Sequence, residues 1–407
     1  MKDLDILVVA QFYYPDEFRV NDITRQMAAD GHTVHVLTGL PDYTTSRIPK
    51  EYKWFRRRRE TVEGVDIIRV PVIARRSGVL FRALNYLSFV VNGRLYARFS
   101  RLKPDLVFSY ETSPVLQVLP AITMAKRRRV PLVIYCCDIW PECLKVWGVK
   151  ESSLLFRYMK RLSRRIFNKG DRVAITSEPF REYLRQVNEV PEEKIRLLPQ
   201  HAEDTFGCIA GEFEDNGVTD FLFAGNIGAA QDVETLVRAA RILREVTDAP
   251  FAVHVVGDGS SRAACQRLSE ELGVEDRVFF HGKHPLSEMV SYYKTADCMV
   301  LTMSESAVGS STLPSKWQGY VNAGRPVVVA ANGIAAEITA QVGCGLCTAA
   351  GDARGLAAAM KQIIDFPEVC REMGERGRRY YEENSRKELF MERLYRIFDE
   401  VLPGKGE

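Results

Sequence analysis

Lys316 is the residue whose type and setting point most directly to chemistry. Residues 311–330 predict a loop, one helix and a buried strand, with Pro314 as the first helical residue and Gly324 at the helix end. A lysine in the first turn is disfavoured by about 0.3–1 kcal/mol, because the helix dipole is positive there. A phosphate at the helix start reverses this penalty, since it binds the free N–H groups and the ammonium together. We interpret the loop as a phosphate site, with a solvated surface lysine as the alternative.

Two glycine loops in the same half of the chain suit the same ligand. Gly225–Gly228 lies between the predicted strand Phe221–Ala224 and a helix. Glycines let a backbone approach a diphosphate closely, and helix starts supply oriented donors. Gly257–Gly259 is either a simple turn or the lining of a base or ribose pocket.

An acidic pair suggests a second reactive site. Asp138 and Glu142 are four residues apart, with Trp140 between them, and they follow a buried strand-like run over 131–137. Such a pair can orient a hydroxyl acceptor or stabilise positive charge at a reacting carbon. The alternative is a helix-capping aspartate beside a core tryptophan.

Strand-like and helical segments alternate in both halves of the chain. Its 407 residues suit two domains, and the alternation predicts two doubly wound parallel α/β sheets. We place the domains at 1–200 and 201–385, and expect a helix within 386–407 to return to the first domain. The loop over 11–19 follows the first strand and should line a ligand site, because ligands of such sheets bind at strand carboxyl ends. It lacks GxGxxG, which argues against a dinucleotide enzyme.

Charge is distributed unevenly along the chain. Residues 1–200 hold 35 Lys and Arg against 22 Asp and Glu, whereas residues 201–407 hold 21 against 31. The basic clusters include Arg56–Arg59, Lys126–Arg129 and the polar faces of a helix predicted over 155–166. A second helix, predicted over 78–103, has an apolar face made by Phe81, Leu84, Leu87, Val91, Leu95 and Phe99. The basic clusters are either solvated surfaces or a docking face for an anionic membrane. Nucleic acid is disfavoured because no known binding motif accompanies the charge. We find no signal peptide and no apolar run of membrane-spanning length, and expect the cysteines to be reduced.

Short segments spread over nearly the whole chain match the motifs of one family, in its order: Phe12–Pro15, Asp30–Val34, Thr112–Pro114, Asp138–Glu142, Leu198–Asp204, Gly225–Gly228, Val256–Gly259, Pro314–Lys316 and Ala323–Pro326. In these segments the chain resembles the GT-B glycosyltransferases of family 4, especially those of bacterial surface-polysaccharide synthesis. Similar members transfer 6-deoxy-amino sugars, such as N-acetyl-L-fucosamine, to lipid-linked O-antigen or capsule intermediates.

The resemblance implies two Rossmann-like domains with an interdomain cleft, an acceptor on the first, a nucleotide-sugar donor on the second, and neither metal nor cofactor. The expected catalytic residues are Asp138, Glu142 and Lys316. The expected acceptor contacts are Tyr13, Tyr14, Pro15, Arg19 and Trp140. The expected donor contacts are Gly225, Asn226, Gly228, Gly257, Asp258, Lys283, Thr312, Leu313, Pro314, Ser315 and Lys316.

Two family features are absent from the sequence. Ser311 and Gly319 stand where the family usually has paired glutamates, and the first glycine loop has Asn226 and Gln231 where the family has a basic pair. Lys316 and backbone N–H groups should then bear most of the diphosphate charge.

The sequence thus predicts a metal-independent, retaining glycosyltransferase. We expect a UDP-sugar donor, a lipid-linked saccharide acceptor, and a cytoplasmic location at the inner face of the cell membrane. The alternatives are a nucleotide-sugar epimerase of the same fold and a non-catalytic glycosyltransferase-like subunit.

Overall fold

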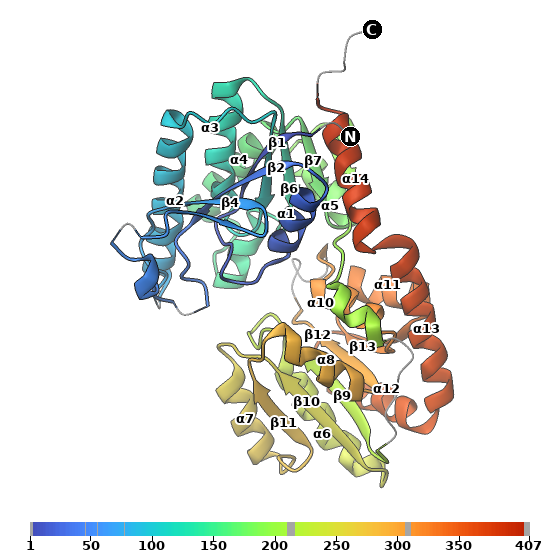
Figure 1. The fold of residues 1–407 in the computed structure, drawn as a ribbon. Helices are drawn as coiled ribbons and strands as arrows, with labels where there is room; N and C mark the ends of the chain where they lie inside the picture. Colours follow the sequence, from blue (N-terminus) through green and yellow to red (C-terminus); the bar gives the residue numbers. More distant parts are fainter. Residues whose placement is uncertain are drawn as a thin grey trace. The chain divides into compact units, whose positions relative to one another are not determined.

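The chain forms two compact units of α/β structure. The computed structural model describes residues 3–44, 46–54, 56–76, 78–209, 216–305 and 311–402. One unit comprises residues 1–198 together with 391–407, and the other comprises residues 199–390 (Figure 1). The two Rossmann-like parallel sheets that the strand–helix alternation predicts are confirmed.

The first unit is built on an eight-stranded sheet of order β3-β4-β2-β1-β5-β6-β7-β8, parallel except for the β3–β4 pair. Its strands are β1 Asp5–Val9, β2 Thr33–Gly39, β3 Arg59–Val62, β4 Val65–Val70, β5 Leu106–Glu111, β6 Leu132–Cys136, β7 Arg172–Ile175 and β8 Ile195–Leu197. Its α-helices are α1 Arg19–Ala29, α2 Val79–Phe99, α3 Leu119–Arg128, α4 Leu154–Phe167, α5 Glu178–Gln186 and α14 Lys387–Asp399.

One hydrophobic core packs helices α2, α3, α4 and α5 against the same face of this sheet. Phe398 of α14 packs edge-on against Phe108 of β5. Just beyond α14, Glu400 accepts hydrogen bonds from Arg172 of β7 and Arg196 of β8. Strand side chains alternate between faces. Phe108 therefore points away from its neighbour Val107, which belongs to the core under α2–α5.

The second unit contains a six-stranded parallel sheet of order β11-β10-β9-β12-β13-β14. Its strands are β9 Thr219–Ala224, β10 Phe251–Val256, β11 Val278–Gly282, β12 Cys298–Thr302, β13 Val327–Ala330 and β14 Gly345–Thr348. Its α-helices are α6 Val233–Val246, α7 Arg262–Glu271, α8 Leu286–Thr295, α10 Ser315–Asn322, α11 Ile334–Val342, α12 Ala353–Asp365 and α13 Pro367–Asn384.

The central strands are continuous apolar runs because helices cover both faces of the sheet. All four residues of β13 are fully buried, for example. The sequence predicts Pro314 as the first helical residue, and this is wrong. Helix α10 begins at Ser315, and Pro314 is the residue before it. Gly324 follows the helix in the left-handed conformation with φ of 68°, as expected of a residue that ends a helix.

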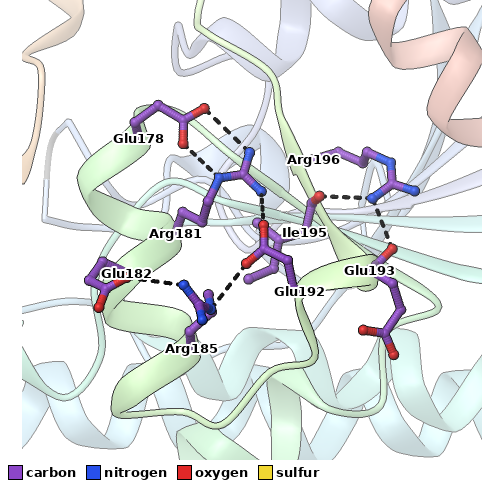
Figure 2. A network of polar contacts seen from close by, with 8 residues as sticks. All are labelled: Glu178, Arg181, Glu182, Arg185, Glu192, Glu193, Ile195 and Arg196. Carbon is purple, nitrogen blue, oxygen red and sulfur yellow. Dashed lines mark hydrogen bonds and ion pairs between the residues drawn. The ribbon is translucent and has the colours of Figure 1, made fainter.

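Arginines at one end of the first sheet are paired with glutamates (Figure 2). Arg181 contacts Glu178 and Glu192, and Arg185 contacts Glu182 and Glu192, at 2.6–3.3 Å. The positive charge of α5 is therefore locally neutralised.

Helix α2 differs from what its pattern suggests. The sequence predicts a helix with an apolar face, but several residues of that face, including Leu87, Leu95 and Phe99, are exposed. The helix packs instead through another set that includes Tyr86, Phe89 and Val90. Nowhere in the described ranges is a helix both long enough and apolar enough to cross a membrane.

Candidate active site

The strand order of the second unit places several loops at one edge of its sheet. The chain runs outward from β9 in both directions, with β10 on one side and β12 on the other. Ligands of open parallel sheets bind where the strand order reverses, at the carboxyl ends of the strands. The loops that follow β9 and β10 and the start of α10 contain most of the predicted donor contacts.

The two glycine loops are in direct backbone contact. The N–H of Gly225 donates to the carbonyl of Val256 at 2.9 Å, and the N–H of Ile227 donates to that of Asp258 at 2.9 Å. A Cβ atom on Gly257 would lie 1.8 Å from the carbonyl oxygen of Gly225. Glycine is therefore required at position 257 for these loops to pack together.

Lys316 extends from α10 to the first of these loops. A Cβ atom on Gly225 would lie 3.5 Å from both Cε and Nζ of Lys316. Tyr320, one helical turn later, exchanges hydrogen bonds with the N–H and carbonyl of Ala224 at 2.9 and 3.2 Å. Because residues four apart share a helix face, Tyr320 holds α10 in the position that brings Lys316 to the glycine loop.

The ammonium of Lys316 is withdrawn from water, and the part of the chain that the structure describes gives it no anionic partner. Its Nζ atom is buried, has no hydrogen-bond partner among the described residues, and lies 3.9 Å from the centroid of the Phe223 ring. Burial lowers the pKa of Lys316 to about 7. The hydroxyl of Thr312, just before α10, is also buried and has no hydrogen-bond partner within the described ranges. An incoming anion would satisfy both groups.

The remaining predicted donor contacts lie around this point. Asn226 is exposed and donates to Gln231 at 2.9 Å, and Gly228 is buried in the same loop. Asp258 is exposed and its carboxylate accepts from the N–H of Gly259. Lys283 is exposed and directly follows β11. The loop before α10 ends in half-buried Leu313 and Pro314, and exposed Ser315 begins the helix.

Sequence reasoning missed Phe223, Tyr320 and Arg262 in this region. The four-residue spacing from Lys316 could have identified Tyr320. Arg262 begins α7 and lies 3.9 Å from the carboxylate of Asp258, with its Nη1 atom near Gly282. No local sequence pattern predicts the contacts of Phe223 with Lys316 or of Arg262 with Asp258. These contacts depend on how strands and loops pack in the folded chain.

In the first unit, loops that follow β1, β5 and β6 lie at the same sheet edge, since these strands are parallel neighbours. Asp138 is half-buried two residues beyond β6. Burial raises the pKa of Asp138, and hydrogen bonds from Ser113 oppose that rise. The indole N–H of Trp140 donates to the Ser113 hydroxyl at 3.2 Å, so Ser113 links the aspartate to the buried tryptophan.

Glu142 is engaged by other side chains. It accepts a hydrogen bond from the Tyr183 hydroxyl at 2.8 Å and forms an ion pair with Lys145 at 2.5 Å. These contacts fix the start of the short 3-10 helix η3, Glu142–Trp147.

A fully buried carboxyl lies behind Asp138, and the sequence analysis did not identify it. Glu111 ends β5 opposite Cys136 of β6 and has no exposed surface. No cation among the described residues forms an ion pair with it. Burial raises the pKa of Glu111 well above its usual range, and the neighbouring charge of Asp138 raises it further.

The predicted acceptor loop after β1 divides into internal and surface residues. Tyr13 is buried, with its hydroxyl 2.6 Å from that of Thr24. Tyr14 is half-buried and Pro15 is exposed. Arg19 is the first residue of α1. Burial raises the pKa of Tyr110 in β5, and the positive charge of Arg19 offsets part of that rise.

Comparison with known proteins identifies both units. The family model described as Glycosyl transferase 4-like domain matches residues 17–201, and the model described as Glycosyl transferases group 1 matches residues 210–380. The putative colanic acid biosynthesis glycosyl transferase WcaI of Escherichia coli (strain K12) is 25% identical over 405 residues, covering 92% of this chain and 96% of that protein.

Solved structures share the fold at low identity. A sucrose-phosphate synthase from Thermosynechococcus elongatus has a TM-score of 0.72 and 18% identity, covering 97% of this chain and 98% of its own. Anabaena HepE in complex with UDP and glucose has a TM-score of 0.69 and 14% identity, covering 97% and 99%.

The buried ammonium of Lys316 predicts how the free energy of unfolding depends on pH. The folded-state pKa of Lys316, about 7, lies below the ordinary value near 10.4, so the folded protein binds fewer protons than the unfolded chain in that window. Stability of the unliganded protein should rise with pH there, by up to about 1.4 kcal/mol per pH unit. Lys316→Met should stabilise the protein most below pH 7, and the gain should shrink toward pH 10.

Denaturant unfolding between pH 6 and 10 measures this effect. Lys283→Met is the control, because it removes an exposed lysine from the same sheet edge. A constant difference between Lys316→Met and wild type at all pH values would contradict a desolvated ammonium.

Glu111 generates a prediction of opposite sign. Because its folded-state pKa lies above the ordinary value near 4.3, the folded protein retains a proton that the unfolded chain loses. Stability should fall as pH rises above that value, by up to about 1.4 kcal/mol per unit. Glu111→Gln removes this ionisation, so its stability relative to wild type should increase with pH. Exposed Glu178→Gln should show no such trend, and parallel profiles for Glu111→Gln and wild type would refute the assignment.

Proposed function

The chain belongs to the GT-B glycosyltransferases of family 4, and from that premise we propose that it transfers a sugar from a UDP-linked donor to a lipid-linked saccharide in bacterial surface-polysaccharide synthesis. The names of two relatives support the biological setting, since WcaI is named for colanic acid biosynthesis and the LpsD protein of Rhizobium meliloti (strain 1021) for lipopolysaccharide core biosynthesis. The UDP complexes of HepE support UDP as the donor nucleotide.

The observation that carries the proposal is the ammonium of Lys316 beside the glycine loops, for which no described residue supplies a hydrogen-bond partner. A buried cation without an anion is costly, and a diphosphate would supply the missing negative charge. Gly225 offers a backbone without a side chain next to that ammonium, so phosphate oxygens can approach closely. The start of α10 adds the positive end of a helix dipole, with no side chain capping it.

In this mechanism Lys316 acts on the leaving group. Negative charge grows on the nucleoside diphosphate as the bond to the sugar breaks, and an ammonium held in place beforehand stabilises that charge without reorganisation. Its low-dielectric position against Phe223 strengthens the interaction. We propose retaining chemistry without a metal ion, because the lysine and the helix end can take the charge that a cation would otherwise neutralise.

We propose that Asp138 orients the acceptor hydroxyl and accepts its proton. Its raised pKa brings the carboxylate closer to the basicity that general-base catalysis needs, and Ser113 holds it in position. We further propose that the transferred group is a 6-deoxy-amino sugar. We also propose that the enzyme is cytoplasmic and peripheral to the inner face of the membrane.

A thermal-shift screen against UDP, GDP, ADP and CMP tests the donor site. Ligand at about 100 times its dissociation constant should add roughly 2.7 kcal/mol of stability. We expect a shift with UDP in wild type and little or none in Lys316→Ala, unchanged by EDTA. Lys361→Ala is the control, because Lys361 pairs with Asp365 on α12. No shift with any nucleotide would favour a non-catalytic subunit.

Donor binding should also take up a proton. A bound diphosphate should return the pKa of Lys316 toward its ordinary value, so UDP binding to wild type should take up about one proton more at pH 8 than at pH 6, where the lysine is already mostly charged. Calorimetry of UDP binding in buffers of different ionisation enthalpy measures this difference. Equal proton uptake at the two pH values would show that the lysine does not contact the diphosphate.

A further inference from the structure

Helix α2 presents an apolar stripe to solvent. Its exposed apolar residues are Leu80, Leu87, Val91, Leu95 and Phe99, with exposed fractions between 49% and 75%. At about 100° per residue they fall within roughly one third of the helix circumference. Large contiguous apolar surfaces of this kind mark interaction sites.

The start of α4 repeats the feature. Leu154, Leu155 and Tyr158 are exposed by 78%, 52% and 62%. Helices α2, α3 and α4 contribute to one hydrophobic core and therefore cover the same face of the first sheet, as Figure 1 shows. We call the exposed apolar and basic residues of these three helices the α2–α4 face.

This face carries positive charge and no acidic residue. No Asp or Glu occurs between Asp66 and Asp105, between Glu111 and Asp138, or between Glu151 and Asp171. The exposed basic residues of the face are Arg94, Arg98, Lys126, Arg157, Lys160, Arg161, Arg164 and Arg165. Of these, Arg164 pairs with Glu189 beyond α4.

Near the end of α2 the basic residues cluster. Arg127 and Arg128 of α3 donate to the Ser100 carbonyl at 2.6 and 2.7 Å. Loss of hydration and the nearby charges of Arg128 and Arg98 lower the pKa of Arg127. By contrast, Arg181 and Arg185 of α5 are neutralised by glutamates (Figure 2).

We propose that the α2–α4 face docks on an anionic lipid bilayer, with the apolar side chains in the interface and the arginines at the headgroups. Apolar residues beside arginines and lysines are the composition of helices that lie in the plane of a membrane. A second copy of the chain fits less well, because pairing two such faces would bring uncompensated positive charges together. A nucleic acid would leave the leucines without a partner.

The inference deepens the proposed function, since a lipid-linked acceptor lies in the bilayer. Helix α2 begins after β4, at the carboxyl edge of the sheet where Asp138 also lies. Arg75, just before the helix, sits over the rings of Tyr43 and Phe12 in the loops of that edge. Docking through α2 would therefore bring the loops of the proposed acceptor site close to the bilayer surface.

Vesicle co-sedimentation of the full chain tests the proposal. Wild type should bind vesicles of phosphatidylcholine mixed with phosphatidylglycerol, and binding should weaken with added salt and with phosphatidylcholine alone. The apolar variant Leu87→Asn/Val91→Asn should bind about tenfold more weakly, because those side chains leave the interface. The charge variant Arg94→Gln/Arg98→Gln should lose a similar factor on anionic vesicles only.

Two matched controls separate the face from general surface effects. Phe366→Asn/Val369→Asn removes apolar side chains of similar exposure, 58% and 47%, from the second unit. Arg181→Gln/Arg185→Gln removes the same number of charges from the paired network. Both controls should bind vesicles as wild type does.

Three results would overturn the inference. The first is no binding of wild type to anionic vesicles, and the second is an equal loss of vesicle binding in variants and controls. The third is unchanged vesicle binding with a loss of self-association in Leu87→Asn/Val91→Asn, which would make the face an interface between copies.

The UDP thermal shift, measured without vesicles on the same variants, should be unchanged. Vesicle binding without any UDP shift would refute the proposed function alone, and a UDP shift without vesicle binding would refute the docking face alone.

Discussion

The desolvated ammonium of Lys316 is the interaction on which the structure of the second unit's ligand site depends. An isolated buried cation is unfavourable, and the contact with the Phe223 ring compensates only in part. The protein holds it there because Tyr320 fixes α10 to the end of β9. The free protein thus carries an electrostatic cost that the proposed anionic ligand would remove.

The backbone around that ammonium must be nearly free of side chains. Gly225 lies against the lysine, and Gly257 packs directly on the Gly225 carbonyl. The two loops hydrogen-bond to each other through backbone groups, so their positions follow from the parallel pairing of β9 and β10. A rigid sheet edge with little side-chain bulk brings phosphate oxygens within reach of backbone N–H groups, which makes a family-wide fold suitable for a specific donor.

The first unit separates its charges by location. Near the ends of β5 and β6, Glu111 is buried and Asp138 is half-buried, whereas the α2–α4 face has basic and apolar residues and no acid. The positive charge of α5 is instead matched by neighbouring glutamates (Figure 2). A surface with the composition of the α2–α4 face directs the unit toward an anionic, partly apolar partner, and a bilayer has both properties.

The sequence by itself determined the two parallel α/β sheets, because strand and helix periodicities and glycine loops are local signals. It also located Lys316 and Asp138, which follow strand or loop patterns. Tertiary structure alone decided that Lys316 is desolvated on Phe223, that Glu111 lies buried beside Asp138, and that α2 exposes its apolar stripe. These features arise from contacts between distant segments. Periodicity shows that a helix has an apolar face but not whether the fold covers it, so burial and pKa follow only from packing.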